Sequence, residues 1–216
     1  MKYKHAVIAI DAAMLKIKDG VLQILLMKMK KNPFQGYWAI PGRLVEADEN
    51  LKEAAENKFY ETTKVSDGYM EQLCTFGDVK RDPAGRVVST AYIALISPNK
   101  KIAERAGELE WYNVKKLPRL AYDHKSIVEY AVKRLQSKIT YTNIIYSLLP
   151  EEFTLSDLQK AYEIILNKEL DKRNFRKKIF SLNLIRETGK KEYGLPKRPA
   201  QLYEFIDKKY KVMEIL

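Results

Sequence analysis

The stretch of sequence that decides the fold runs from residue 41 to residue 55 and reads Pro41-Gly42-Arg43-Leu44-Val45-Glu46-Ala47-Asp48-Glu49-Asn50-Leu51-Lys52-Glu53-Ala54-Ala55. Its Pro-Gly pair marks a turn. The residues that follow predict a helix over 49–63, because Leu51, Ala54 and Phe59 recur at helical spacing among charged residues. Carboxylates three or four residues apart share one face of a helix, so this helix can present several acidic side chains together.

That arrangement suits one kind of chemistry. Cleavage of a phosphoanhydride needs Mg²⁺ or Mn²⁺ to neutralise phosphate oxygens and to activate water, and such hard cations take oxygen ligands. The stretch resembles the box of the Nudix family, a loop–helix–loop whose carboxylates hold divalent metal against a diphosphate. The resemblance implies an α/β fold, the Nudix-like α/β/α sandwich of the α+β type, for the first part of the chain.

The sequence departs from the Nudix box where the metal would lie. Aligned on Pro-Gly and Glu-Ala-Ala, Glu49 matches the first glutamate, and Arg43 takes the place of the first glycine. The Arg-Glu pair becomes Asn57-Lys58, the Glu-Glu pair becomes Glu61-Thr62, and Lys64 replaces the closing glycine. A lysine at a ligand position repels Mg²⁺. We therefore expect no bound metal, no cofactor and no catalytic residues, only the remnant box carboxylates Glu49 and Glu61.

The resemblance extends along most of residues 5–136. The stretches 76–79, 81–89 and 117–124 are similar to the branch of the Nudix family that acts on ADP-ribose. We expect a nucleotide-sugar or sugar effector, such as ADP-ribose, to be bound by Arg43, Glu46, Arg81, Arg86 and Trp38. Arginines suit phosphates because their hydrogen bonds are charge-assisted and often bidentate, and Phe34 and Tyr37 can flank a base or sugar as Trp38 can.

Plainer roles stay open for several of these residues. Arg81 or Arg86 can form a turn salt bridge with Asp82, and Trp38 can be ordinary core. His124 follows Asp123, but an isolated histidine is more often structural, so we assign it no catalytic role.

The remaining elements divide the chain into two predicted domains, 1–137 for effector sensing and 138–216 for DNA binding. Strands are expected over 5–13, 21–29, 71–80, 86–96 and 108–114, followed by a helix over 126–135. The second part then reads as three helices and two short strands, at 142–149, 154–166, 171–182, 184–188 and 201–205. Pro150 separates the first two of these helices, Thr154 or Ser156 can cap the second, and Asp171 is the better cap for the third.

The second part carries a strong concentration of positive charge. Residues 168–198 contain 11 basic and four acidic residues, within a chain of 216 residues whose net charge is +11. In the helix 171–182, Phe175, Ile179 and Leu182 form an apolar stripe, and the polar residues project elsewhere. Such a helix suits the DNA major groove. The DNA-binding residues we expect are Lys172, Arg173, Asn174, Arg176, Lys177 and Lys178, with Lys197 and Arg198 in a wing.

Both halves together, in this order, resemble the Nudix-related transcriptional regulators. The second half does so through residues 149–159, 171–177 and 198–205. The resemblance implies a C-terminal winged helix-turn-helix domain, a homodimer, and binding of a palindromic double-stranded DNA operator under the control of the small-molecule effector. We expect a repressor, although the sign of regulation, the operator and the effector are not fixed by the sequence.

Composition agrees with an intracellular regulator. Hydrophobic residues make up 46% and charged residues 31% of the chain, as in globular proteins. The single cysteine, Cys74, cannot form an intramolecular disulfide and reads as a small buried hydrophobe. No apolar run approaches the roughly 18 residues needed to span a bilayer, and the N-terminus lacks the features of a secretory signal. We expect a cytoplasmic protein without a membrane partner.

Two other functions compete with this interpretation. The first is an active Nudix hydrolase of the ADP-ribose pyrophosphatase type that uses the non-standard ligands Glu46, Glu49, Glu53 and Glu61. The second is a nucleotide-binding or RNA-associated module without operator specificity, since phosphate contacts alone give non-specific, salt-sensitive affinity.

Overall fold

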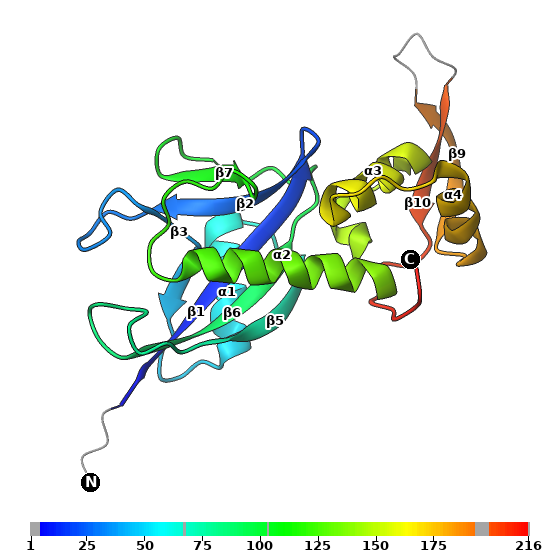
Figure 1. Ribbon diagram of the computed structural model, residues 1–216. Coiled ribbons are helices and arrows are strands. Elements are labelled where there is room, and N and C mark those ends of the chain that lie inside the picture. Colours follow the sequence, from blue (N-terminus) through cyan, green and yellow to red (C-terminus); the bar gives the residue numbers. More distant parts are fainter. Residues whose placement is uncertain (1–4, 67, 103, 193–198, 216) are drawn as a thin grey trace. The chain divides into compact units, whose positions relative to one another are not determined.

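The computed structural model of the protein describes residues 5–66, 68–102, 104–192 and 199–215. These residues form two compact units. The first contains the described residues up to 16 together with 23–96 and 100–133, and the second contains 17–22, 97–99 and the residues from 134 onward. Figure 1 shows a sheet with helices in the first unit, and helices with a small hairpin in the second.

The first unit is built on a mixed sheet. Within the described residues the sheet has seven strands. The order is β3 (Trp38–Ala39), β2 (Val21–Lys28), β1 (Val7–Lys18), β6 (Val87–Leu95) and β5 (Tyr69–Phe76), while β4 (Gly42–Leu44) pairs with β1, and β7 (Leu109–Asn113) pairs with β2. Strands β1 and β6 run parallel, which places Asp11 beside Ala91. Strand β4 runs antiparallel to β1, with Asp11 opposite Gly42.

Two helices lie on opposite faces of this sheet, α1 (Leu51–Thr63) and the first part of α2 (His124–Tyr141) (Figure 1). Helix α1 buries Ala54 and Ala55 against Ile10 and Tyr92 of the sheet. Further along the helix, Phe59 packs in a second cluster with strand residues. These contacts give the α/β/α sandwich that the sequence predicts, because the apolar stripe of α1 matches the buried side of β1 and β6.

Local hydrogen bonds set the ends of α1. The side chain of Asn50 accepts from the backbone N–H groups of Lys52 and Glu53, both at 3.0 Å, and the Glu53 carboxylate accepts from the N–H of Asn50 at 2.9 Å. This capping box satisfies N–H groups that the first turn would leave unpaired. At the other end Lys64 adopts a left-handed conformation (φ 58°), and its N–H bonds to the carbonyl of Tyr60. The helix thus begins two residues later than predicted.

The second unit has the helix–helix–hairpin order of a winged helix. After the end of α2 come the 3₁₀ helix η1 (Ile144–Leu148), β8 (Phe153–Thr154), α3 (Leu155–Leu166), α4 (Lys172–Ser181), β9 (Ile185–Glu192) and β10 (Ala200–Phe205). The small sheet has the order β8-β10-β9 and is antiparallel. Its core includes Phe153, Tyr162, Phe175 and Phe205, all buried.

Several elements differ from their predicted limits. Strand β1 continues to Lys18, and its pairing with β6 extends past the predicted end to Leu15. Helix α2 continues to Tyr141, through residues 137 and 138. The predicted helix 142–149 is a five-residue 3₁₀ helix; the buried amide of Asn143 bonds instead to the carbonyl of Lys209 and the N–H of Lys211, both at 2.8 Å. Strands β3, β4 and β8 were not predicted. In the part of the chain that is described, no helix is long and apolar enough to cross a membrane.

Candidate functional site

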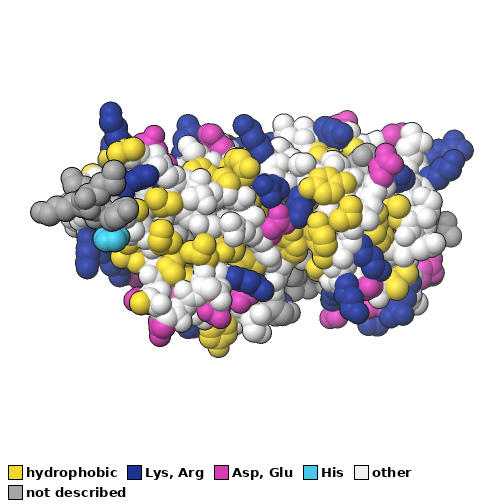
Figure 2. Space-filling model, turned by 90° about the horizontal axis from the view of Figure 1, so that it is seen from below, with side chains coloured by type: hydrophobic (Ala, Val, Ile, Leu, Met, Phe, Trp, Pro, Cys, Tyr) yellow, Lys and Arg dark blue, Asp and Glu magenta, His cyan; other side chains and the backbone are white. Residues whose placement is uncertain are grey.

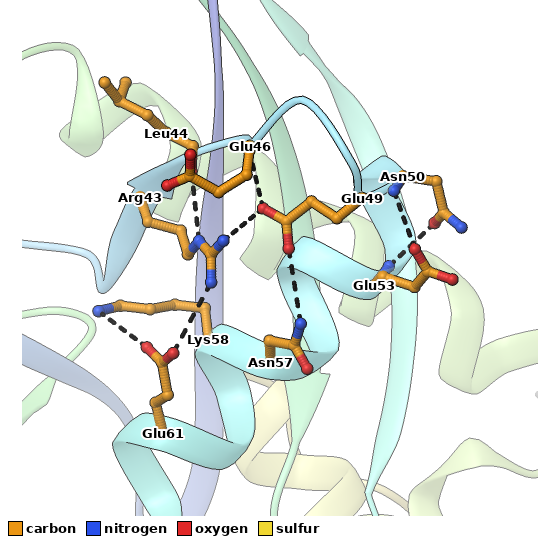
Figure 3. Close-up of polar contacts among 9 residues, drawn as sticks. All are labelled: Arg43, Leu44, Glu46, Glu49, Asn50, Glu53, Asn57, Lys58 and Glu61. Atoms are coloured by element: carbon orange, nitrogen blue, oxygen red, sulfur yellow. Dashed lines mark hydrogen bonds and ion pairs between the residues drawn. The ribbon is translucent and has the colours of Figure 1, made fainter.

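The first candidate site lies where β4 meets α1, and Arg43 is at its centre. Its Nη2 donates to Oε1 of Glu49, its Nε donates to the carbonyl of Leu44 at 3.2 Å, and its Nη1 lies 3.7 Å from Oε1 of Glu61 (Figure 3). The Arg43 and Glu49 side chains are 23% and 11% exposed. Arg43 therefore joins both remnant box carboxylates, one at each end of α1.

Glu49 and Glu61 have further donors around them. Glu49 accepts from the backbone N–H of Glu46 at 2.9 Å and from Nδ2 of Asn57 at 3.5 Å. The hydrogen bond from Glu46, helped by the positive charge of Arg43, lowers the pKa of Glu49. Nζ of Lys58 lies 4.0 Å from Oε2 of Glu61. Both remnant carboxylates are thus bound by the protein's own cations and N–H groups.

The residues at this position do not fit the metal that a Nudix box implies. Among the described residues, no group of three or more His, Cys, Asp or Glu side chains is arranged to hold a metal ion. The charges of Glu49 and Glu61 are balanced by Arg43 and Lys58. Glu53 serves the helix cap, and Glu46 contributes a backbone N–H to Glu49. A divalent cation would have to displace a guanidinium from an existing ion pair, so the geometry is that of a closed charge cluster.

Two adjoining cavities open on the first unit. One, the aromatic cavity, has a volume of about 590 Å³ and is lined by residues including Phe34, Phe76, Arg81, Pro83, Tyr122 and Asp123. The other, the strand cavity, has a volume of about 270 Å³ and is lined by residues including Ile10, Asp11, Gly42, Arg43, Arg81 and His124. Arg81 and Tyr122 line both cavities. The rings of Phe34 and Tyr122 lie 4.5 Å apart, so an apolar wall faces charged groups across this space.

A buried ionic network holds the wall between these cavities. Arg81 binds Asp123 through two hydrogen bonds, Nε to Oδ2 at 3.0 Å and Nη2 to Oδ1 at 2.8 Å. The same Nη2 donates to Oδ2 of Asp11 at 3.3 Å. The Arg81 side chain is only 4% exposed. Burial disfavours its charge, but the hydrogen bond from Arg81 to Asp123 and the charges of Asp11 and Asp123 outweigh that effect and raise the pKa of Arg81.

His124 completes the network in its neutral form. Its Nδ1 accepts the backbone N–H of Ile40 at 2.9 Å, so the proton is on Nε2, which faces Oδ1 of Asp11 at 3.4 Å. Burial lowers the pKa of His124. Asp11 also accepts from Oγ of Ser89 at 2.6 Å. Gly42 packs over this carboxylate so closely that a Cβ there would lie 2.3 Å from Oδ1 of Asp11, which explains the glycine.

The predicted effector residues are therefore placed unequally. Arg43 and Arg81 line the cavities, each already bound to carboxylates. Trp38 is buried and packs its ring on Tyr112 at 4.9 Å, which is the core role that the sequence left open. Arg86 donates from Nη1 to the carbonyls of Gly77 and Asp78 at 2.8 and 3.2 Å, and so closes a loop that lines the aromatic cavity. Within the described part of the chain, neither Arg81 nor Arg86 pairs with Asp82, which was the alternative prediction.

The second candidate site is the exposed face of α4. Asp171 caps this helix, accepting from the N–H of Asn174 at 2.7 Å, as predicted. Phe175 and Ile179 are buried, and the Phe175 ring lies edge-on to Tyr162 of α3 at 5.4 Å. The exposed polar side chains of the helix include Lys172, Arg173, Asn174 and Lys177, and Phe180 near its end is also exposed. The helix is thus fixed by its apolar stripe and presents three cations and an amide to solvent.

The other predicted DNA-binding residues lie differently. Arg176 and Lys178 are half-buried, and Nε of Arg176 has no hydrogen-bond partner within the described part of the chain. Lys197 and Arg198 fall outside the described residues. On the hairpin, Arg186 pairs with Glu204 at 2.7 Å, and Lys190 pairs with Glu152 at 2.9 Å. Figure 2 shows Lys and Arg side chains, in dark blue, distributed over the surface of the protein together with acidic side chains.

Sequence reasoning missed the network around Asp11. Asp11, Ser89 and Asp123 were not selected, and His124 was identified only as structural, a role that its buried hydrogen bonds confirm. One signal was present: Asp11 is an acidic residue inside an otherwise apolar predicted strand, and a buried carboxylate needs a partner. Its partners are 70 to 113 residues away in sequence, so the pattern alone did not identify them.

Comparison with known protein families divides the chain as the structure does. Residues 8–131 match the NUDIX domain model, and residues 145–205 match the model described as the NrtR DNA-binding winged helix domain. Over 214 residues, the chain is 36% identical to the ADPR responsive transcriptional repressor NtrR of Acinetobacter baylyi, covering 96% of this chain and 85% of that protein. Over 128 residues it is 35% identical to the ADP-ribose pyrophosphatase of Methanocaldococcus jannaschii, covering 59% of this chain and 73% of that protein.

Solved structures give the same picture. NrtR of Shewanella oneidensis in complex with a 27mer DNA has 32% sequence identity and a TM-score of 0.82, with 92% of this chain and 93% of that chain covered. The NUDIX domain of the same protein in complex with ADP ribose has 34% identity and a TM-score of 0.54, with 62% of this chain and 90% of that chain covered. The likeness thus extends over both units.

Proposed function

This chain belongs to the family that joins a NUDIX domain to an NrtR DNA-binding winged helix, and on that premise we propose that it is an ADP-ribose-responsive transcriptional repressor. The observation that carries the proposal is that charged side chains of the box are paired in the first unit and cations of α4 are exposed in the second. The carboxylates of the box are neutralised by Arg43 and Lys58, whereas the cations on α4 are exposed. The chain therefore has a surface for a polyanion and a ligand pocket without the metal site of an enzyme.

We assign operator recognition to α4. Arg173 and Asn174, near the start of the helix, are the side chains suited to read guanine and adenine edges in the major groove. Lys172 and Lys177 are suited to phosphate oxygens, which set position without reading sequence. Arg176 and Lys178 are half-buried and so less accessible to DNA than these four side chains. Lys197 and Arg198 remain proposed backbone contacts of the wing.

We assign the effector to the two cavities of the NUDIX domain. The rings of Phe34 and Tyr122 offer a surface on which an adenine can stack. The polar side, with Arg43 and Arg81, faces the phosphates and ribose hydroxyls. Glu46, Arg86 and Trp38 act from outside the cavities in this proposal, Arg86 by holding the loop 77–78 and Trp38 by core packing. The domain binds ADP-ribose without hydrolysing it, since its carboxylates hold cations of the chain itself.

We further propose a homodimer in which residues 1–137 sense the effector and residues 138–216 bind DNA, with helix α2 running across this boundary. Two α4 helices related by a two-fold axis would read half-sites one helical turn apart, or a multiple of that spacing. Effector binding would act by favouring an arrangement of the dimer that does not fit the operator, which requires ADP-ribose to bind that arrangement more tightly. The likeness to a relative named as an ADPR responsive transcriptional repressor supports repression under the control of ADP-ribose.

The test is a binding experiment on the full chain. DNA fragments selected from a genomic library supply the operator, and fluorescence anisotropy measures its affinity at physiological salt with and without ADP-ribose. We expect tight, sequence-specific binding that ADP-ribose weakens at least tenfold, a coupling of roughly 1.4 kcal/mol. Equal affinity for random DNA would favour the non-specific nucleic-acid module instead.

The rival function is that of an ADP-ribose pyrophosphatase, which is the name of the relative from M. jannaschii. Its ligands would be Glu46, Glu49, Glu53 and Glu61. Incubation of the chain with ADP-ribose and Mn²⁺, followed by chromatography for AMP, separates the two functions. We expect no AMP. Release of AMP that is abolished by Glu49→Gln would overturn the proposal that the domain binds ADP-ribose without hydrolysing it.

A further inference from the structure

We propose that Arg43 is a built-in counter-ion of the remnant box, one that holds Glu49 and Glu61 together in place of a divalent metal and lets the domain bind its ligand without one. The part of this inference that concerns ADP-ribose rests on the proposed function. The part that concerns the charge cluster rests on the side-chain geometry alone (Figure 3).

The geometry of Arg43 shows a guanidinium fixed in one place. Its backbone is held by the pairing of β4 with β1, which puts Arg43 opposite Ile10. Its Nε donates to the carbonyl of Leu44, Nη2 to Glu49, and Nη1 lies 3.7 Å from Glu61. Every nitrogen of the planar fork thus faces an oxygen, an arrangement that a rotating lysine ammonium does not reproduce.

Charge balance explains why a divalent metal ion should not bind at this cluster. Glu49 and Glu61 contribute two negative charges, and Arg43 and Lys58 contribute two positive ones, so the cluster is neutral. Mg²⁺ and Mn²⁺ bind where oxygen ligands carry uncompensated negative charge. Replacing Arg43 by glycine and Lys58 by glutamate would leave three carboxylates and no cation, which reverses the balance with two substitutions.

The same contacts of Arg43 also fix the position of β4 relative to α1. Arg43 ties β4, whose first residue Gly42 packs on Asp11, to Glu49 just before α1 and to Glu61 within it. The wall of the strand cavity is therefore held in its ligand-binding shape before any ligand or ion arrives. Such preorganisation lowers the cost of binding, and it makes effector affinity independent of the concentration of divalent ions.

The first experiment uses the unmodified chain. Calorimetry measures ADP-ribose affinity in EDTA and in excess Mn²⁺, and electron paramagnetic resonance measures free Mn²⁺ without ADP-ribose. We expect the same ADP-ribose affinity in both buffers and no saturable Mn²⁺ binding. Loss of affinity in EDTA, or stoichiometric Mn²⁺ binding by the parent, would overturn the proposal. Failure to bind ADP-ribose in either buffer would overturn the proposed effector, while the Mn²⁺ measurement would still decide on the counter-ion.

The second experiment removes both cations from the cluster, which should create the metal site that they block in the parent. The variant Arg43→Gly/Lys58→Glu should bind Mn²⁺ saturably, at concentrations at least about tenfold below the highest at which the parent shows no binding, because three carboxylates then converge without a cation. Lys52→Glu is the matched control: Lys52 is on the same helix but pairs with Glu56, away from Arg43, and should gain no Mn²⁺ site. Circular dichroism confirms folding of each chain. Arg43→Gln is the milder second variant, and it should bind Mn²⁺ with intermediate affinity; parent-like affinity in both folded Arg43 variants would disprove the counter-ion.

Discussion

The two candidate sites use positive charge in opposite ways. In the sensor domain, Arg43 and Arg81 are each bound to two carboxylates, and Arg81 is almost fully buried. On α4, Arg173 and Lys177 are exposed, and the helix is held by Phe175 and Ile179 instead. The same residue types are therefore paired with carboxylates in one region and exposed to solvent in the other.

The difference shows what each region has to recognise. A small ligand enters a cavity whose walls must already be in place, and buried ion pairs with several hydrogen bonds keep such walls fixed. A DNA helix presents a long row of phosphates, and mobile exposed cations meet them at little cost in desolvation. Total charge does not separate these roles, whereas burial and pairing do.

The largest expected effect breaks the network of the sensor domain. Replacing Arg81 by alanine leaves Asp11 and Asp123 without their shared cation, and removal of one partner of a buried ion pair costs about 3–5 kcal/mol. Arg173→Ala, on the exposed face of α4, should change stability by no more than about 0.5 kcal/mol. Urea unfolding of both variants, followed by circular dichroism, measures the difference.

Arg86→Ala provides a control from the same loop as Arg81. Its guanidinium is exposed and donates only to two backbone carbonyls, so the expected loss is about 1 kcal/mol. Equal losses for Arg81→Ala and Arg86→Ala would show that burial of the ion pair is not what stabilises this wall.

The second effect concerns DNA and separates two kinds of contact on α4. Arg173→Ala should weaken operator binding by about 1–3 kcal/mol and reduce discrimination between operator and altered sequences. Lys177→Ala should weaken binding to all sequences alike and lower the dependence of log affinity on log salt by about one. Anisotropy titrations at several salt concentrations distinguish the two.

Lys133→Ala removes the same charge from an exposed position on α2 and is the matched control. It should leave affinity and salt dependence at the parent values. Should Arg173→Ala also bind like the parent, α4 would not be the recognition helix.

The contrast between the two sites also explains what the sequence predicted well. Helix α4, its cap Asp171 and its apolar stripe are local features, set by residues within about one or two turns of one another, so their spacing is readable. The pairing of Lys58 with Glu61 is local for the same reason, because the two residues are neighbours on one helix. The structure added the pairing of Arg43 with Glu49 and Glu61, which depends on how β4 docks beside α1.

The Asp11 network could not be predicted from the sequence, because its members come from four separate segments. Ser89 reaches Asp11 only because β1 and β6 pair in parallel at that register, and Arg81 does so only because the loop before β6 folds back. Strands of two or three residues, such as β3 and β8, were missed because they are too short to show alternation. Trp38 was assigned to the effector by residue type, which does not distinguish a core ring from a ligand platform.

The smallest expected effect is on the pH dependence of folding stability, which His124 should cause in the sensor domain. His124 is neutral and buried, and burial lowers its pKa. When the chain unfolds, His124 regains an ordinary pKa near 6.5. Below that pH the unfolded state binds a proton that the folded state does not, so stability is fully present above pH of about 6.5 and falls as the pH is lowered. The slope is at most about 1.4 kcal/mol per pH unit for one proton.

His124→Asn removes the titrating group while keeping an acceptor for the N–H of Ile40. Its free energy of unfolding should therefore change less than that of the parent between pH values of about 7.5 and 5.5, when both are measured in urea. The sequence contains one other histidine, His5, which is exposed. His5→Asn should retain the slope of the parent, and an unchanged slope in His124→Asn would show that the network tolerates a protonated imidazole. The exposed face of α4 has no histidine, so stability lost in this range would come from the sensor domain.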